Sequence, residues 1–230
     1  MSILITGNRG FIASGLEGDG IDIKDGIDIV TYKAQKQYDV VIHAAALTSV
    51  TESMRSPKAY YRTNVQGTLN MVQQHPEAHF IYLSTAGIYG EGTKHTVKSR
   101  VNPTSVYTKT KLYGENIIKE FAKSYVILRL TNVVGEGERG EPNVYQIFER
   151  EEVLPIYGDG LQTRDFVTVE HVRKVIMKCV NLNGTFNVGS GVSKTIRQVA
   201  EEFNKPMKFL PARPEEIRHS GVADAFNLNS

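Results

Sequence analysis

The chain has a single cysteine, almost no net charge and no apolar run long enough to cross a membrane. Cys179 is alone among 230 residues, which excludes an internal disulfide and any metal site built from several cysteines. A formal net charge of +2 without a dense Lys/Arg block argues against a nucleic-acid partner. A first strand that begins at Ile3 leaves no room for a signal peptide. We therefore expect a cytoplasmic protein without nucleic-acid or membrane partners, whose reduced cysteine packs on an apolar face.

Short apolar runs alternate with helix-like stretches along the first part of the chain. The apolar runs predict buried parallel strands at Ile3–Ile5, Ile21–Ile23, Val40–His43, Phe80–Ser84 and Val126–Leu130. Two longer stretches between them, Pro57–Gln74 and Ser105–Lys123, have the character of helices. This alternation predicts an α/β protein with a doubly wound parallel sheet, the Rossmann fold.

Beyond Gly135 the pattern loosens into shorter segments. Strand-like pieces are expected around Val153–Tyr157, Phe166–Val169, Thr185–Val188 and Lys208–Leu210. They predict a small C-terminal lobe that faces a substrate. Because the sequence has no repeat, low-complexity tract or linker, we expect residues 1–230 to form one unit. Its dinucleotide-binding core would lie mainly in residues 1–135 and its substrate lobe mainly within 136–230.

A glycine-containing turn, TGNRGFIAS, follows the first predicted strand. Gly7 permits a tight turn, Gly10 lets the backbone approach a pyrophosphate, and the small Ala13 allows close packing of a helix on the strand. We expect a helix to open here, with its N-terminus towards the negative charge. Asn8 stands where a second glycine is usual, and its tolerance of positive φ makes it a substitute. A purely structural turn is the alternative interpretation.

Acidic residues after the second predicted strand are candidates for recognising the adenosine ribose of a dinucleotide. Asp22 is the candidate for hydrogen bonds to the adenosine ribose, and a carboxylate there favours NAD over NADP because it repels a ribose phosphate. It lies only 15 residues after Gly7, where about 20 is usual, so the first crossover helix must be short. Asp25 is an alternative for this role, and Asp28 is expected near the adenine. A solvated acidic loop would also explain these residues.

A tyrosine and a lysine four residues apart, Tyr107 and Lys111, occur in PTSVYTKTKLYGE. On a helix this spacing places both side chains on one face. An ammonium beside a phenol favours the phenolate and lowers the tyrosine pKa, which yields a proton acceptor near neutral pH. Together with a dinucleotide site, the pair indicates oxidation and reduction of an alcohol carbon.

These motifs resemble the extended short-chain dehydrogenase/reductases, specifically the NAD-dependent nucleotide-sugar epimerase/dehydratase family. The resemblance covers nearly the whole sequence and includes VVIHAAA, SPKAYYRTNVQGTLNMV, FIYLSTAGIYGE, YTKTKLYGE, LRLTNVVGEG, GDGLQTRDFVTV, FNVGSG and PARPEEIRHSGVAD, in the family's order. It implies catalysis by Thr85, Tyr107 and Lys111. It implies an NAD site lined by Gly7, Asn8, Arg9, Gly10, Phe11, Ile12, Asp22, Asp28, Ile29, Ala44, Ala45, Ala46, Thr48, Asn64, Ser84, Tyr107, Lys111 and Thr131.

The same resemblance implies a nucleotide-diphosphate sugar as substrate. Arg164 and Arg213 stand where the family places guanidiniums on the diphosphate, a task that suits the planar fork of arginine. The resemblance places Thr85, Asn132 and Asn143 against the substrate as well. It also implies a homodimer that pairs through the two helices holding Asn64 and Tyr107. A surface salt bridge is the alternative interpretation of Arg213.

The two residues after Thr85 limit the reactions that the site can catalyse. Family dehydratases carry an acid–base pair there, whereas this chain has Ala86 and Gly87, which cannot transfer protons. The hypothesis we favour is a 4-epimerase that passes through a transient 4-keto sugar, with a UDP-hexose as substrate. Two alternatives stay open: a 4-keto reductase or dehydrogenase, which consumes cofactor stoichiometrically, and a non-catalytic dinucleotide-binding protein.

Overall fold

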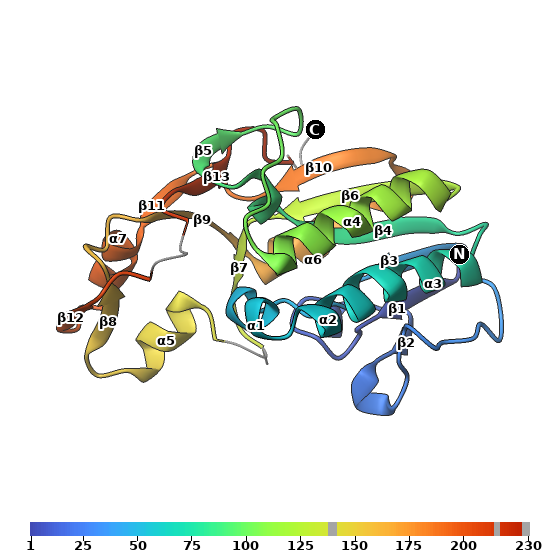
Figure 1. The fold of residues 1–230 in the computed structure, drawn as a ribbon, viewed down its shortest axis with the longest axis horizontal. Helices are drawn as coiled ribbons and strands as arrows, with labels where there is room; N and C mark the ends of the chain where they lie inside the picture. Colours follow the sequence, from blue (N-terminus) through green and yellow to red (C-terminus); the bar gives the residue numbers. More distant parts are fainter. Residues whose placement is uncertain (138–141, 214–216, 227–230) are drawn as a thin grey trace.

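The computed structural model describes residues 1–137, 142–213 and 217–226 (Figure 1). Six parallel strands form a central sheet in the order β10-β6-β4-β3-β1-β2. Their bounds are β1 Ile3–Thr6, β2 Asp19–Ile21, β3 Val40–His43, β4 His79–Thr85, β6 Ser124–Leu130 and β10 Gly184–Val188. The predicted α/β fold with a parallel sheet is confirmed. Strand order reverses at β1, because β2 lies on one side of it and β3 on the other.

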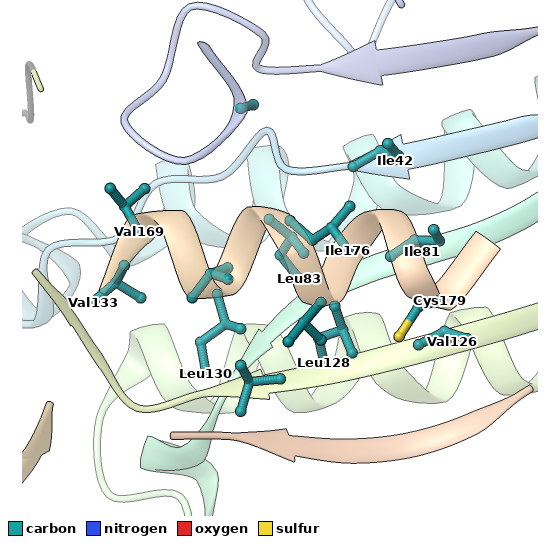
Figure 2. Close-up of a cluster of buried hydrophobic side chains, with 14 of the residues drawn as sticks. Ile42, Ile81, Leu83, Val126, Leu128, Leu130, Val133, Val169, Ile176 and Cys179 are labelled. Carbon is teal, nitrogen blue, oxygen red and sulfur yellow. The ribbon is translucent and has the colours of Figure 1, made fainter. Parts of the chain in front are cut away.

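One face of the central sheet is covered by helix α6, Val169–Lys178. Successive strand residues point to opposite faces, so on β1 Ile5 joins the cluster under α6 while Leu4 joins the cluster on the other face. Figure 2 shows the apolar side chains of α6 and of Cys179 lying against the strands. Cys179 is fully buried there, and burial raises the pKa of its thiol to about 11. The predicted apolar packing of this cysteine is confirmed.

The opposite face is covered by two long helical segments (Figure 1). One is α4, Val106–Phe121, which confirms the predicted helix at 105–123. The other runs through α2 (Pro57–Tyr60), a π-helical segment η3 (Tyr61–Gly67) and α3 (Thr68–Gln74), within the bounds predicted for it. Helix α1, Val50–Arg55, precedes them. None of the helices in the described part of the chain has the length and apolar character needed to cross a bilayer.

Smaller sheets lie beside the carboxyl ends of the central strands (Figure 1). The strands pair as β11-β9-β7, β12-β8 and β13-β5. Together with α5 and α7 they comprise β5 Gly92–His95, β7 Asn132–Val134, α5 Val144–Arg150, β8 Leu154–Tyr157, β9 Thr163–Thr168, β11 Ser193–Thr195, α7 Ile196–Glu201, β12 Met207–Leu210 and β13 Ser220–Val222. Phe148, Leu154 and Ile196 belong to a separate apolar cluster in this region. By contrast, α6 and β10 follow residue 135 in sequence but pack into the central sheet.

Two expectations about the first crossover are wrong. The glycine turn opens no α-helix: only a three-residue 3-10 turn, η1 Ala13–Gly15, follows it. Residues 7–18 must turn at the end of β1 and return beside Ile3–Thr6 to start β2 at Asp19, which leaves no room for a helix. The second strand is also displaced from its predicted place, because Ile23 already lies in a further 3-10 turn, η2 Ile23–Asp25.

A buried ion pair joins α4 to the sheet. The guanidinium of Arg129 on β6 donates to both carboxylate oxygens of Glu115 on α4, at 3.0 and 2.7 Å. Ser84 of β4 donates its hydroxyl to the same carboxylate at 2.6 Å. Arg129 also donates to the hydroxyl of Tyr89, in the 3-10 turn η4 Ala86–Tyr89, and Tyr89 donates to Asn187 of β10. Five elements, α4, β4, β6, η4 and β10, are therefore joined by hydrogen bonds around one buried ion pair.

Replacing Arg129 with methionine should lower the free energy of unfolding by about 3–5 kcal/mol, because it leaves the Glu115 carboxylate buried without its partner. Urea denaturation followed by circular dichroism measures this loss. The control is Lys123→Met, which breaks the exposed pair between Lys123 and Glu77 and should change stability little. Equal losses in the two variants would contradict a central role for the buried pair.

Candidate active site

The glycine turn lies at the carboxyl end of β1, next to the end of β3, where the strand order reverses. Gly7 has a φ of 67°, and its N–H donates to the carbonyl of Ile21 at 2.8 Å. A Cβ at this position would lie 2.8 Å from the backbone of Ala45, so no other residue fits without displacing the chain. In open α/β sheets this point of reversal is where ligands bind. The turn and the Ala44–Ala46 segment are thus brought together as a dinucleotide site requires.

Asp22 lies beside the glycine turn and is only 7% exposed. Its carboxylate accepts the backbone N–H of Arg9 at 3.1 Å and that of Lys24 at 2.9 Å. Asp25 instead forms an exposed ion pair with the side chain of Arg9 at 2.6 Å. The geometry therefore favours Asp22 over Asp25 as the carboxylate that faces a ribose bound at the turn.

Asn8 differs from its expected role. Among the described residues, Asn204 is the non-glycine residue with positive φ, so Asn8 does not adopt the left-handed conformation. Its side chain packs on Gly20, where any Cβ would overlap it. The side-chain amide oxygen of Asn8, Oδ1, is buried without a hydrogen-bond partner in the protein. A ligand at the turn is one source of the missing donor.

Asp28 and Ile29 lie against the η3 segment rather than in the glycine turn. Asp28 accepts the N–H of Val30 and the guanidinium of Arg62, at 2.9 and 2.6 Å. Partial burial opposes ionisation of Asp28, but these hydrogen bonds outweigh it and hold its pKa below the usual value. Ile29 is buried where Gly67 leaves space for its side chain.

Asn64 connects the loop after β3 with helix α4. Its amide accepts the N–H of Leu47 at 2.8 Å and donates to the Leu47 carbonyl at 2.9 Å. The same amide donates to the hydroxyl of Thr110 on α4 at 3.0 Å. Since Ala44–Ala46 and Thr48 flank Leu47, Asn64 fixes this loop relative to the helix that carries Tyr107 and Lys111. Asn64 sits in the π-helical segment, a distortion that often marks functional sites.

Thr85 ends β4 close to the first turn of α4. Its hydroxyl accepts the N–H of Gly87 at 3.1 Å. A Cβ on Gly87 would lie 3.3 Å from that hydroxyl and 3.0 Å from the methyl group of Thr108. Ser105 caps α4 and exchanges hydrogen bonds with Thr108, so the turn that bears Tyr107 is rigidly placed. The end of β4 and the tyrosine turn are therefore neighbours, as the catalytic assignment requires.

Lys111 lies one turn further along α4 and is only 4% exposed. Its ammonium stands 4.1 Å from the ring centroid of Tyr82, a cation–π contact. Burial lowers the pKa of Lys111 to about 7, although the Glu115 carboxylate favours the charged form. Tyr82 stacks in turn on His43, whose pKa burial and the charge of Lys111 lower to about 3. The imidazole is therefore neutral at physiological pH.

The expected substrate residues fall into two groups. Asn132 converges on Asp165 together with Thr131, which was expected at the cofactor. Asp165 accepts from the Thr131 hydroxyl at 3.5 Å and, through its backbone carbonyl, from the Asn132 amide at 3.1 Å. Arg164, next to Asp165 on β9, donates to the carbonyls of Thr163 and Arg218.

The second group lies on other elements. Arg213 is exposed and stacks 3.8 Å above the ring of Tyr157. Asn143 caps α5, and its buried amide nitrogen has no partner in the protein. The rest of the Arg213 motif, residues 214–216, lies outside the described residues.

Asp165 is a buried polar residue of this region that the sequence motifs did not single out. Asp165 is fully buried and accepts hydrogen bonds from the N–H and hydroxyl of Ser190 and from the N–H of Gly191, at 2.8, 2.8 and 3.1 Å. Its position inside an alternating strand pattern, next to Arg164, was a usable signal. Ser84 was also expected at the cofactor; in the structure its hydroxyl donates to Glu115.

A dinucleotide-binding sheet with a Thr, Tyr and Lys at its carboxyl edge defines an extended short-chain dehydrogenase/reductase. A family model described as "NAD dependent epimerase/dehydratase family" matches residues 15–189. The chain belongs to this family, whose cofactor is NAD. The residues present fit that cofactor: Gly7 lets the Ala45 backbone close on the turn, the Asp22 carboxylate lies beside the turn, and the side-chain oxygen of Asn8 is unpartnered.

Individual relatives agree with the family. The chain is 34% identical over 213 residues to a protein named putative UDP-glucose 4-epimerase from Methanocaldococcus jannaschii, covering 85% of this chain and 70% of the relative. It is 32% identical to UDP-glucose 4-epimerase of Drosophila melanogaster, covering 80% and 64%. The structure of Thermus thermophilus UDP-glucose 4-epimerase in complex with NAD matches with a TM-score of 0.85 at 25% identity, over 97% of this chain and 90% of that one. The chain thus spans about two thirds of the length of these curated relatives.

The pKa of Lys111 predicts how stability depends on pH. The unfolded lysine keeps its proton up to about pH 10.5, whereas the folded one loses it near pH 7. Between pH 7 and 9 the unfolded chain therefore binds more protons, so the free energy of unfolding should rise with pH. Urea denaturation at pH 7, 8 and 9 measures this rise, which Lys111→Met should remove. Lys109→Met, an exposed change on the same helix, should keep it. Identical pH slopes in the two variants would contradict the assignment.

Proposed function

We propose that this protein is an NAD-dependent 4-epimerase of a nucleotide-diphosphate sugar, with a UDP-hexose as substrate. The observation that carries the proposal is that Thr85, at the end of β4, lies beside the first turn of α4. That turn bears Tyr107, and the buried Lys111 lies one turn further along the helix. At the same junction Ala86 and Gly87 occupy the positions where a dehydratase needs an acid and a base. Proton transfer at this site is therefore left to Tyr107.

Each residue of the trio has a distinct task. Tyr107 takes the proton of the C4 hydroxyl and later returns it to the C4 oxygen. The hydroxyl of Thr85 donates a hydrogen bond to the C4 oxygen and stabilises the negative charge that develops there. Lys111 holds the nicotinamide ribose and, when protonated, stabilises the phenolate of Tyr107. When bound, NAD would supply the hydride acceptor and donor for C4, and the Gly7 turn and Asp22 would hold its pyrophosphate and its adenosine ribose.

The substrate is held by its diphosphate. Arg164 and Arg213 are the proposed cationic contacts, and arginine suits phosphate because it makes paired hydrogen bonds. Asn132 and the unpartnered amide of Asn143 are proposed to donate to the sugar and the diphosphate. The turning of a 4-keto sugar requires a firm grip on the nucleotide and a loose one on the hexose. The small Ala86 and Gly87 leave that space.

The cofactor and the substrate are proposed to bind to different parts of the chain. Residues 1–135 would supply most of the NAD site, and residues 136–230 most of the substrate lobe. We further propose a reducing, cytoplasmic setting, in keeping with the buried and unpaired Cys179.

Tyr107→Phe tests the catalytic proposal. It should lower turnover of UDP-glucose to UDP-galactose by about 10²–10⁴-fold, because the proton acceptor is lost. Affinity for NAD should change little. Proton NMR of the anomeric signals follows turnover, while absorbance at the reduced-cofactor band reports net NADH. Tyr113→Phe, an exposed tyrosine of the same helix, is the matched control.

The alternatives give different results in the same experiment. Stoichiometric NADH formation would identify a dehydrogenase or reductase. Full turnover by Tyr107→Phe would contradict the assigned role of the tyrosine. Tight NAD binding with no conversion of any nucleotide sugar would favour the non-catalytic alternative.

We also propose a homodimer that pairs through the helices carrying Asn64 and Tyr107. In support, this helical face exposes a shallow apolar hollow lined by Val65, Tyr113, Asn116, Ile117, Glu120 and Phe121. Tyr113 is 49% and Phe121 58% exposed, and large apolar side chains that gather at one exposed hollow are typical of an interaction surface.

Phe121→Glu should weaken this association by about 2 kcal/mol or more, since it places a charge in an apolar contact. Sedimentation velocity across a concentration series measures the shift towards monomer. The control is Phe209→Glu, an exposed phenylalanine on β12, outside the proposed interface. A wild-type protein that is monomeric at all concentrations would contradict the proposal.

A further inference from the structure

A guanidinium from the second half of the chain is bound to the glycine turn. Arg173 of α6 donates from Nε to the carbonyl of Ile12 and from Nη2 to the carbonyl of Phe11, both at 2.9 Å. Its Nη2 also lies 3.4 Å from the Ser14 hydroxyl. These partners are 159 to 162 residues away in sequence, so the contact is a tertiary link between α6 and the first crossover.

The two carbonyls belong to the segment where a crossover helix is missing. In a full helix, the carbonyls of Phe11 and Ile12 would accept N–H groups from the next turn. Here η1 ends at Gly15, and the chain then runs into β2 at Asp19. Arg173 supplies the donors that the absent turn would have supplied.

Gly15 is the second half of this arrangement. A Cβ at Gly15 would overlap the guanidinium of Arg173. The absence of a side chain at Gly15 therefore leaves space for the arginine. Two separate residues, one on each element, are adapted to the same contact.

The guanidinium charge of Arg173 lies on the carbonyl side of these two peptide groups. In a trans peptide the N–H points away from the C=O, so the N–H groups of Ile12 and Ala13 point away from the guanidinium. A cation at the carbonyl end of aligned peptide dipoles stabilises them in the same sense as a cation at a helix C-terminus. The effect favours negative charge on the opposite, N–H side of the turn.

We propose that Arg173 is a positioning residue for the cofactor: it replaces the missing crossover helix, holds the glycine turn in its binding conformation and strengthens binding of the NAD pyrophosphate. This inference rests on the proposed NAD site at that turn. It assigns α6 a task in cofactor binding that neither the glycine motif nor the Tyr–Lys pair reveals.

Arg173→Met is the direct test, with the Kd for NAD measured by calorimetry. We expect the Kd to rise about tenfold, within the range known for charge–dipole contacts. ADP, which shares the pyrophosphate but lacks the nicotinamide, should lose affinity by the same factor. Hydrogen exchange of the segment 11–16 should also accelerate in the protein without ligand. Lys174→Met, which removes an exposed charge from the same helix, should change neither quantity.

Gly15→Ala perturbs the contact from the other side, and its effect in the wild-type background can be measured even where Arg173→Met fails to fold. It should raise the Kd for NAD in the wild-type background. It should have little further effect in an Arg173→Met background, because the contact is already lost. Equal effects in both backgrounds would show that Gly15 acts independently of Arg173 and would overturn the proposal.

Other outcomes separate this inference from the proposed function. An unchanged NAD affinity in Arg173→Met, with only a lower thermal unfolding temperature, would make the contact purely structural and overturn the inference alone. A wild-type chain that binds NAD but epimerises no sugar would overturn the proposed function and leave the inference standing on the measured Kd values. A wild-type chain that binds no NAD would overturn both.

Discussion

The ion pair between Glu115 and Arg129 determines where helix α4 lies, and the candidate active site depends on that helix. Glu115 is one turn beyond Lys111, and both are buried against the sheet. Arg129 pairs in register with Ser84, the residue before Thr85 on β4. The pair therefore links the helix that carries the tyrosine and lysine to the strand that carries the threonine. Burying these two charges carries a desolvation penalty. The ion pair therefore stabilises the fold only when all of its hydrogen-bond partners are in place.

The same helix is held at two further points. Asn64 joins it to the loop after β3, which lines the cofactor site, and the Tyr82 ring lies beneath the Lys111 ammonium. On the other face of the sheet the first crossover is reduced to a short turn, and α6 provides the apolar cover together with the Arg173 contact. Catalytic and cofactor-binding elements are thus tied to the sheet by polar contacts between segments far apart in sequence.

Local patterns predicted the strands and long helices because buried strands and amphipathic helices leave apolar runs of characteristic period. The short crossover was indicated by the spacing of Gly7 and Asp22, yet a helix was still expected from the glycine motif, wrongly. Glu115 could not be predicted as the partner of Arg129, since the neighbours of Glu115 in sequence are unremarkable. A charge inside the apolar strand VILRL was the available signal that Arg129 needs a buried partner. The roles of the candidate site residues stay predictions.

The central claim is that the hydride removed from the sugar returns to the same sugar. Conversion of UDP-glucose carrying deuterium at C4, followed by NMR and mass spectrometry of the product, measures this directly. Epimerisation predicts UDP-galactose that keeps the deuterium at C4, with no exchange with added unlabelled NADH or solvent. Loss of the label to the cofactor pool, with accumulation of a free keto sugar, would contradict epimerisation and identify a dehydrogenase.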